Sequence, residues 1–313
     1  PDWTVGWHRV WQWAQARATE LDTNRHACQA RRAAACHDGG MPEEQRTRVV
    51  VVTGASSGIG RSTVRSLRAE GRVVLATARR ADRLEELAAE TGAEVLAGDI
   101  TDDAFVAELR DTASRLGEVE ALVNVAGGAF GTESVEESSI ADWQLMFELN
   151  VLGTKRVITA FLPLLRASAA SSTDEFQHAD IVTVTSTAGR VIYQGGGGYV
   201  ATKAAEAAMI GVLRLELGGE PIRVIDIAPG MVHTEEFTLK RMRGDEASAD
   251  KLYEGVDHPL TAEDIAATIQ LALQLPGHVN VDELVVRPVA QREQFQLHRG
   301  PLVMKGATKE AGE

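Results

Sequence analysis

Short apolar runs alternate with longer amphipathic stretches from residue 48 onward. The apolar runs are continuous, as in residues 49–52, which is typical of parallel strands buried on both faces. They predict strands near 48–53, 72–77, 94–98, 120–124, 180–185, 222–227 and 283–287. The stretches between them predict helices near 58–70, 82–90, 102–116, 140–167, 199–218 and 261–275. We therefore expect an α/β fold, a single Rossmann-like doubly wound parallel sheet of about seven strands with helices on both faces.

The first forty residues differ in composition from the rest of the chain. Four of the five Trp lie within the first 13 positions, and Arg is frequent there while Lys is absent. We expect 1–40 to be a poorly structured N-terminal extension, with Met41 as the natural start. A Trp-rich arm that binds a partner is the alternative. The Rossmann-like catalytic domain is then expected over 41–298, with a mobile lid at 231–258 and a frayed C-terminal tail at 299–313.

Composition and charge exclude several classes of protein. A hydrophobic content of 44% and a charged content of 25% are those of a soluble globular protein. The net charge of −13 argues against nucleic-acid binding, which needs a basic face, but not against a phosphate-bearing cofactor. No stretch has the apolar length of a membrane span or a signal peptide, so a cytoplasmic protein is expected. Both cysteines, Cys28 and Cys36, precede residue 41, so we expect no disulfide, cysteine nucleophile or metal site in the main domain.

A glycine-rich turn, T-G-A-S-S-G-I-G over residues 53–60, follows the first predicted strand and opens a helix. Glycines permit a tight turn and close backbone approach, and the helix N-terminus presents amides to a pyrophosphate. A plain glycine-rich turn is the alternative, but the strand–turn–helix context favours a dinucleotide site. The residues expected to contact the cofactor here are Gly54, Ser56, Ser57, Gly58, Ile59 and Gly60.

The ends of the next three predicted strands carry further candidates for the cofactor site. Arg79 and Arg80 lie about where an NAD-specific site places an acid for the ribose 2′-hydroxyl. Guanidinium groups bind phosphate bidentately, which favours NADP over NAD, although two solvated arginines are the alternative. Asp99 and Ile100 are expected to meet the adenine. Asn124, Ala126 and Gly127 are expected to line the cofactor with backbone and amide groups.

Tyr199 and Lys203 are four residues apart and therefore share one face of a predicted helix. An ammonium close to a phenol favours the phenolate, so this tyrosine is a candidate proton donor or acceptor. Ser186 follows a predicted strand at its carboxyl end, where ligands bind in open α/β sheets. A surface Tyr–Lys pair that falls at helical spacing by chance is the alternative.

Six motifs occur in a fixed order over about residues 48–290. They are T-G-A-S-S-G-I-G at 53–60, N-V-A-G at 124–127, Asn150 in E-L-N-V-L-G, Ser186, Tyr199-x-x-x-Lys203, and Pro229-Gly230 followed by Val232 and Thr234. Together they resemble the short-chain dehydrogenase/reductase family. The resemblance implies strand order 3-2-1-4-5-6-7 and hydride transfer to or from a nicotinamide. One position departs from the family pattern: Val125 stands where a second Asn is usual, which we expect to affect local rigidity rather than chemistry.

The resemblance also implies a role for each matching residue. Tyr199 is the expected acid/base, and Ser186 is expected to hydrogen-bond the substrate oxygen. Lys203 is expected to bind the nicotinamide ribose and to lower the pKa of the tyrosine, and Asn150 to hold a water in the proton relay. The residues expected to bind the nicotinamide amide and diphosphate are Pro229, Gly230, Val232 and Thr234.

Four stretches of the C-terminal half are informative: 222–230, T-E-E-F at 234–237, L-T-A-E-D-I at 260–265 and L-P-G-H-V-N-V at 275–281. They resemble bacterial NADP-dependent 3-hydroxy acid and serine/allo-threonine dehydrogenases, and related carbonyl reductases share much of them. This implies interconversion of a secondary alcohol and a ketone, with a 3-hydroxy acid or β-hydroxy amino acid as substrate. The alternatives are a broad-specificity carbonyl or ketone reductase and a non-catalytic NADP-binding regulator. The complete set of Ser186, Tyr199, Lys203 and Asn150 argues against the regulator.

Basic residues near the expected site are candidates to meet a substrate carboxylate, although each alone is also explained as a solvated surface charge. They are Arg190, His233, Lys240, Arg241 and Arg243. The predicted helix at 140–167 and strand at 283–287 resemble the two interfaces that family members use, so a homo-oligomer, either a dimer or a tetramer, is expected.

Overall fold

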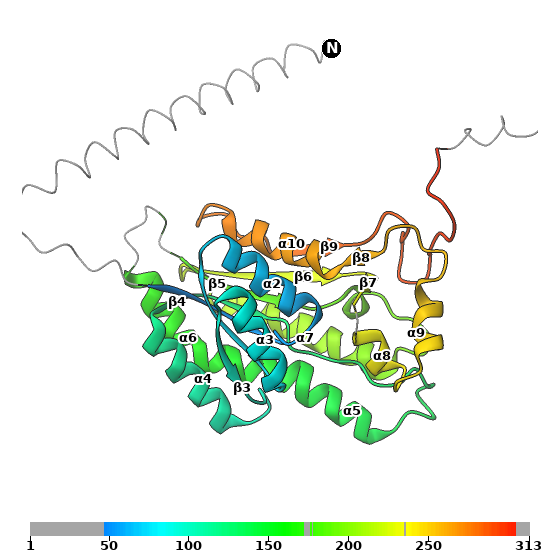
Figure 1. Cartoon of the computed structure of the whole chain (residues 1–313), viewed down its shortest axis with the longest axis horizontal. Coiled ribbons are helices and arrows are strands. Elements are labelled where there is room, and N and C mark those ends of the chain that lie inside the picture. Colours follow the sequence, from blue (N-terminus) through cyan, green and yellow to red (C-terminus); the bar gives the residue numbers. More distant parts are fainter. Residues whose placement is uncertain (1–46, 172–175, 177, 235, 305–313) are drawn as a thin grey trace, which may run out of the picture. The chain divides into compact units, whose positions relative to one another are not determined.

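Seven strands form one parallel sheet in the order β3-β2-β1-β4-β5-β6-β9 (Figure 1). The computed structural model describes residues 47–171, 176, 178–234 and 236–304. The strands are β1 (Arg48–Thr53), β2 (Val73–Ala78), β3 (Glu94–Ala97), β4 (Glu118–Asn124), β5 (Ala179–Val184), β6 (Ile222–Pro229) and β9 (Glu283–Val286). In sequence order this is 3-2-1-4-5-6-7, so the predicted fold class and strand order are confirmed.

Helices cover both faces of the sheet. One face carries α4 (Asp103–Leu116), α6 (Thr154–Ser171) and α7 (Gly197–Glu216), and the other carries α2 (Gly58–Ala69), α3 (Ala81–Thr91) and α10 (Ala262–Gln274). In β1, Val49 and Val51 join the first core and Val50 and Val52 join the second. Side chains alternate along a strand, so a strand covered on both faces needs apolar residues at every position.

The predicted helix over 140–167 is interrupted in the structure. Helix α5 (Ile140–Phe147) begins after Ser139, whose side chain accepts a hydrogen bond from the backbone N–H of Asp142. A π-helical turn, η1 (Glu148–Gly153), then leads into α6. The apolar period of a helix does not reveal a single wide turn, because the residues on either side keep their helical spacing.

The segment predicted to be a lid contains three short elements, β7 (Val232–His233), α8 (Phe237–Arg241) and α9 (Glu246–Tyr253). Strand β7 pairs with β8 (Leu260–Thr261), and the Tyr253 hydroxyl donates to the Val232 carbonyl at 2.9 Å. The mobility of this segment stays a prediction.

Two backbone amides of the C-terminal tail make hydrogen bonds to the end of the segment predicted to be a lid. The Gly300 amide donates to the Gly255 carbonyl at 2.7 Å, and the Leu302 amide donates to the Asp257 carboxylate at 2.8 Å. The end of the segment predicted to be a lid thus supplies partners for these two amides, and the fraying of the tail stays a prediction.

The predicted N-terminal extension at 1–40 lies outside the described residues. Within the described part of the chain, every helix is too short or too polar to cross a membrane.

Candidate active site

A cavity of about 790 Å³ opens at the carboxyl ends of the strands, around the point where the strand order reverses between β1 and β4. Its wall is made of the segments that follow β1, β2, β3, β4, β5 and β6. The predicted site residues that line it are Gly54, Ser56, Ser57, Gly58, Ile59, Gly60, Arg79, Arg80, Asp99, Ile100, Ala126, Gly127, Ser186, Tyr199, Lys203, Pro229, Gly230, Val232 and Thr234. Residues from six separate segments of the sequence thus meet in one cavity.

The glycine turn after β1 is shaped for close backbone approach. Gly54 has φ +70°, and a Cβ atom there would lie 2.8 Å from the Ala126 amide nitrogen. A Cβ at Gly60 would overlap the Gly54 carbonyl. The loop after β4 therefore touches this turn directly. A larger residue at Gly54 would push the loop and the turn apart, and one at Gly60 would push the start of α2 away from the Gly54 carbonyl.

The start of α2 leaves polar groups available to a phosphate. Ser57, the residue before the helix, makes no side-chain cap, and the first turn contains no acidic residue. The Thr234 hydroxyl oxygen is buried and has no hydrogen-bond partner among the described residues, and its methyl carbon would lie 3.4 Å from a Cβ at Gly58. Free helix amides and an unpaired hydroxyl at one place fit the diphosphate of a dinucleotide.

Arg80 is anchored at the expected position of a ribose phosphate. Its guanidinium donates to the Ser56 hydroxyl at 3.0 Å and to the Glu236 carboxylate at 2.6 Å. Although burial raises the pKa of Glu236, hydrogen bonds from Arg80 and Lys240 lower it to about 2. Arg79, the residue before Arg80, has a side chain that is 60% exposed, and its guanidinium lies 3.8 Å from the Asp99 carboxylate.

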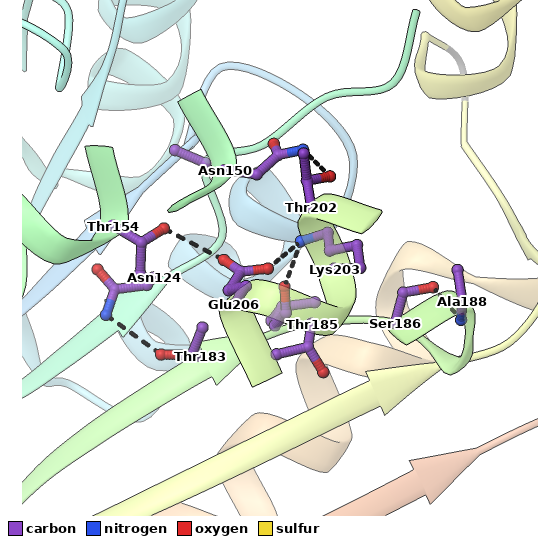
Figure 2. A network of polar contacts seen from close by, with 12 residues as sticks. Asn124, Asn150, Thr154, Thr183, Thr185, Ser186, Ala188, Thr202, Lys203 and Glu206 are labelled. Carbon is purple, nitrogen blue, oxygen red and sulfur yellow. Dashed lines mark hydrogen bonds and ion pairs between the residues drawn. The ribbon is translucent and has the colours of Figure 1, made fainter. Parts of the chain in front are cut away.

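Ser186 is placed so that its hydroxyl proton is available to a substrate. The residue follows β5 and precedes the short 3₁₀ turn η2 (Thr187–Gly189), where its oxygen accepts a hydrogen bond from the Ala188 amide at 3.1 Å (Figure 2). The side chain is buried and lines the cavity. A hydroxyl that accepts from the backbone still has its own O–H to donate.

Tyr199 lies in the first turn of α7, with its ring packed in an aromatic and cationic environment. The Phe237 ring meets it edge-on, with centroids 5.6 Å apart. The Arg241 guanidinium lies 5.6 Å from the Tyr199 ring centroid and 5.5 Å from that of Tyr193. Burial raises the pKa of Tyr193, so this second cavity phenol keeps its proton over a wider pH range.

Lys203 lies one turn further along α7 and is almost completely buried. Its ammonium donates to the Val184 carbonyl at 3.1 Å and to the Glu206 carboxylate at 2.6 Å (Figure 2). Burial lowers the pKa of Lys203, but the neighbouring carboxylate outweighs this and raises it overall. The lysine is thus held as a cation inside the protein.

Asn150 does not line the cavity, and its expected role of holding a water stays a prediction. It is fully buried in the π turn, where its oxygen accepts from the Gly128 amide at 2.8 Å and its nitrogen donates to the Gly128 carbonyl at 2.9 Å. The same nitrogen donates to the Thr202 hydroxyl at 3.2 Å. The side chain thus joins the loop after β4 to α7 through both amide hydrogens, and its oxygen, which accepts one hydrogen bond, keeps a second lone pair.

Asn124 also lies outside the lining of the cavity, and its expected contact with the cofactor stays a prediction. It is buried at the end of β4, where its amide donates to the Thr183 hydroxyl at 3.4 Å. The Thr53 hydroxyl oxygen binds the following loop instead, accepting from the amides of Val125 and Ala126 at 3.0 and 3.1 Å. The Asn124 amide nitrogen therefore supports the sheet, while its buried side-chain oxygen has no hydrogen-bond partner among the described residues.

Of the five basic candidates for substrate binding, only Lys240 and Arg241 line the cavity. Arg190 is bound to the Asp226 and Glu283 carboxylates, both at 2.5 Å. Arg243 is bound to the Asp142 and Glu133 carboxylates at 2.7 and 3.2 Å. His233 packs on the Tyr253 ring, with centroids 4.4 Å apart. These three side chains have structural partners and are not available at the site.

Two features of the site were not predicted from the sequence. The aromatic wall of the cavity is formed by Phe130, Tyr193, Phe237 and Tyr253, which come from three separate segments without a shared motif. Glu206 was also missed, although it stands three residues after Lys203 and so falls on the same helix face, a signal that was present in the sequence. The described residues contain no cluster of three or more His, Cys, Asp or Glu side chains that could hold a metal ion.

Proteins of similar sequence indicate the family to which this chain belongs. The family model for short chain dehydrogenases matches residues 48–243. An oxidoreductase of Mycobacterium tuberculosis, itself named as uncharacterised, is 47% identical over 243 residues, which cover 78% of this chain and 92% of that protein. A serine 3-dehydrogenase of Agrobacterium fabrum is 39% identical over 254 residues, covering 80% of this chain and 98% of that protein. An NADP-dependent 3-hydroxy acid dehydrogenase of Shigella flexneri is 36% identical over 246 residues, covering 78% and 96%.

A solved structure agrees with these relatives. The closed form of a serine dehydrogenase complexed with NADP⁺ is 35% identical, with a TM-score of 0.73, and the match covers 80% of this chain and 99% of that one. The chain belongs to the short-chain dehydrogenase/reductase family and is an oxidoreductase of that family. Its similarity to serine and 3-hydroxy acid dehydrogenases, expected from the sequence, is confirmed.

Proposed function

We propose that this oxidoreductase uses NADP(H) to interconvert a secondary alcohol and a carbonyl compound that carries a carboxylate, such as a 3-hydroxy acid or a β-hydroxy amino acid. The observation that carries the proposal is that Ser186, Tyr199 and Lys203 line one cavity. In that cavity the Arg241 guanidinium lies over the ring of Tyr199. A bound nicotinamide supplies or accepts the hydride. Ser186 donates a hydrogen bond to the reacting oxygen, and Tyr199 exchanges the proton with it.

Arg241 supports an anionic substrate, because the protein leaves its charge unbalanced. The guanidinium donates to the Gly195 carbonyl at 3.3 Å, and its buried Nε has no hydrogen-bond partner among the described residues. No carboxylate of the described residues forms an ion pair with it, whereas Lys240 beside it is paired with Glu236 at 2.7 Å. A partly buried cation with an unused, buried donor in a cavity favours a ligand carboxylate.

A panel of substrates tests the proposed function with the wild-type chain. NADPH oxidation is measured with 3-oxo acids and neutral ketones, and NADP⁺ reduction with 3-hydroxy acids, serine and allo-threonine. We expect the carboxylate-bearing compounds to have a kcat/KM at least about tenfold above that of neutral ketones of equal length, a preference of about 1.4 kcal/mol. A broad carbonyl reductase, which the aromatic wall would suit, predicts no such preference. Absence of turnover with every compound and both nicotinamides contradicts the proposal.

Replacing Arg241 should raise KM for carboxylate substrates selectively. In Arg241→Met we expect KM for the best acid to rise by about 10- to 100-fold, because a charge-assisted hydrogen bond contributes about 1.5–3 kcal/mol. The KM for a neutral ketone should change little. Arg243→Met is the matched control, since it removes a nearby cation that does not line the cavity. Equal losses for acids and ketones would show that Arg241 only shapes the pocket.

Arg80 should decide the preference for NADPH over NADH. In Arg80→Ala we expect the NADPH/NADH ratio of kcat/KM to fall by about 100-fold, because two charge-assisted hydrogen bonds to the 2′-phosphate are lost. Glu236→Gln should tighten NADPH binding, because it frees the Arg80 guanidinium from its present carboxylate partner. Arg83→Ala is the control, since Arg83 is exposed on α3 and paired with Glu86 at 3.3 Å. An unchanged ratio in Arg80→Ala would assign the phosphate to another residue.

Homo-oligomer formation and cytoplasmic location stay predictions from the sequence.

A further inference from the structure

The carboxylate of Glu206 is buried next to Lys203 and has no role in the reaction proposed above. Glu206 lies on α7, is 1% exposed and does not line the cavity. One of its oxygens accepts from the Lys203 ammonium at 2.6 Å, and the other accepts from the Thr154 hydroxyl at 3.2 Å at the start of α6 (Figure 2). Burial raises the pKa of this carboxyl, and Lys203 opposes that rise.

The ammonium of Lys203 needs such a partner. It has three N–H donors, and the Val184 carbonyl and Glu206 take two of them. One donor is thus left for a ligand on the cavity side. An ammonium removed from water loses its proton readily unless an opposite charge compensates for the desolvation. Glu206 supplies that charge from the side of Lys203 that faces the protein interior.

The other charges near this pair are already matched. Asp226 on β6 is the second carboxylate close enough to act on both Lys203 and Glu206. It is bound to the Arg190 guanidinium at 2.5 Å and to the Thr185 hydroxyl at 2.5 Å. Glu283 holds the other side of Arg190, and Arg241 lies across the Tyr199 ring. Among the described residues, Glu206 is therefore the carboxylate that balances Lys203 directly.

We propose that Glu206 is a positioning residue for the reaction: it fixes the Lys203 ammonium, keeps it charged, and so sets the pH range in which Tyr199 works. This inference rests on the proposed function. A neutral side chain at 206 has two consequences. While Lys203 remains protonated, its uncompensated charge stabilises the phenolate more strongly. At higher pH, Lys203 loses its proton earlier and that assistance disappears.

The test is the pH profile of alcohol oxidation in Glu206→Gln. Alcohol oxidation needs the phenolate, so we expect the acid limb of the kcat profile to move down by about 1 pH unit. A new loss of activity should appear on the alkaline side, where the uncompensated lysine deprotonates. Glu206→Asp, which restores the charge with a shorter reach, should return the profile part of the way to that of the wild type.

Asp180→Asn is the matched control. Asp180 is a buried carboxylate bound to the Arg223 guanidinium at 2.6 and 2.7 Å. It lies on β5 six residues before Ser186, which places it roughly 20 Å from the site at about 3.3 Å per residue. We expect Asp180→Asn to lose about as much stability as Glu206→Gln, but to leave both the acid and the alkaline limb of the kcat pH profile where they are in the wild type. Equal movement in both variants would show that any buried ion pair has this effect and would overturn the proposal.

A second readout needs no substrate. The ¹⁵N NMR signal of the Lys203 side chain should report deprotonation at a lower pH in Glu206→Gln than in the wild type. An inactive wild type would contradict the proposed function, and this titration would still decide the role of Glu206. If a folded Glu206→Gln variant has the kcat pH profile and the Lys203 titration of the wild type, the proposal for Glu206 is overturned and the proposed function is not affected.

Discussion

Tyr199→Phe is expected to lower kcat by about 10³- to 10⁴-fold while NADPH binding stays close to that of the wild type. The substitution removes one oxygen and leaves the ring, so the edge contact with Phe237 and the guanidinium of Arg241 over the ring face are retained. Only the hydroxyl that is proposed to exchange the proton is lost. Steady-state kinetics give kcat, and titration of NADPH fluorescence gives the cofactor affinity.

Tyr193→Phe provides the comparison for this variant. It removes a second buried phenol from the same cavity, at a similar distance from Arg241. Its effect on kcat should be far smaller. Burial raises the pKa of Tyr193, so this phenol stays protonated and is not available to accept a proton. A Tyr199→Phe variant that keeps activity within about tenfold of the wild type would show that another group transfers the proton.

Lys203→Met should lose both activity and stability. The variant leaves the Glu206 carboxylate buried without its cation, which is expected to cost about 3–5 kcal/mol of unfolding free energy at neutral pH. The double variant Lys203→Met/Glu206→Leu should recover most of that stability and none of the activity. Urea unfolding measures the first quantity and kcat the second.

The stability loss in Lys203→Met should be smaller at low pH than at neutral pH. Burial raises the pKa of Glu206 above its ordinary value of 4.5, so the folded variant holds this proton more tightly than the unfolded chain. The deficit relative to the double variant should therefore be smallest below pH 4.5 and grow as the pH rises through the raised pKa. A deficit that does not change with pH would mean that lost packing, and not the orphaned carboxylate, destabilises the variant.

The sequence was most informative where one local pattern decides the structure. Continuous Val runs predicted buried parallel strands, and the glycine turn predicted a helix start with close backbone approach. Both depend on residues a few positions apart, so periodicity and spacing reveal them. The pairing of Tyr199 and Lys203 on one helix face is of the same kind.

The sequence was less informative where a distant partner decides what a side chain does. Nothing local marks Arg190 as bound by Asp226 and Glu283, 36 and 93 residues away. The link from Arg80 to Glu236 spans 156 residues. Likewise, Asn150 turned out to be held by Gly128 and Thr202, and this follows from the meeting of a loop and a helix that no spacing rule predicts.

The π turn at Glu148–Gly153 makes the length of this segment matter as well as its composition. Such a turn contains one residue more than an α-helical turn, and each residue of a helix rotates the chain by about 100°. The wide turn takes up this extra residue within one full turn, so α6 keeps its orientation relative to α5, and Thr154 meets Glu206. One further inserted residue would not be taken up in this way and would rotate α6 by about that angle, which would turn the Thr154 hydroxyl away from the Glu206 carboxylate. Insertions between Phe147 and Thr154 are thus a route by which the surroundings of Lys203 are disturbed without any change in the residues of α7.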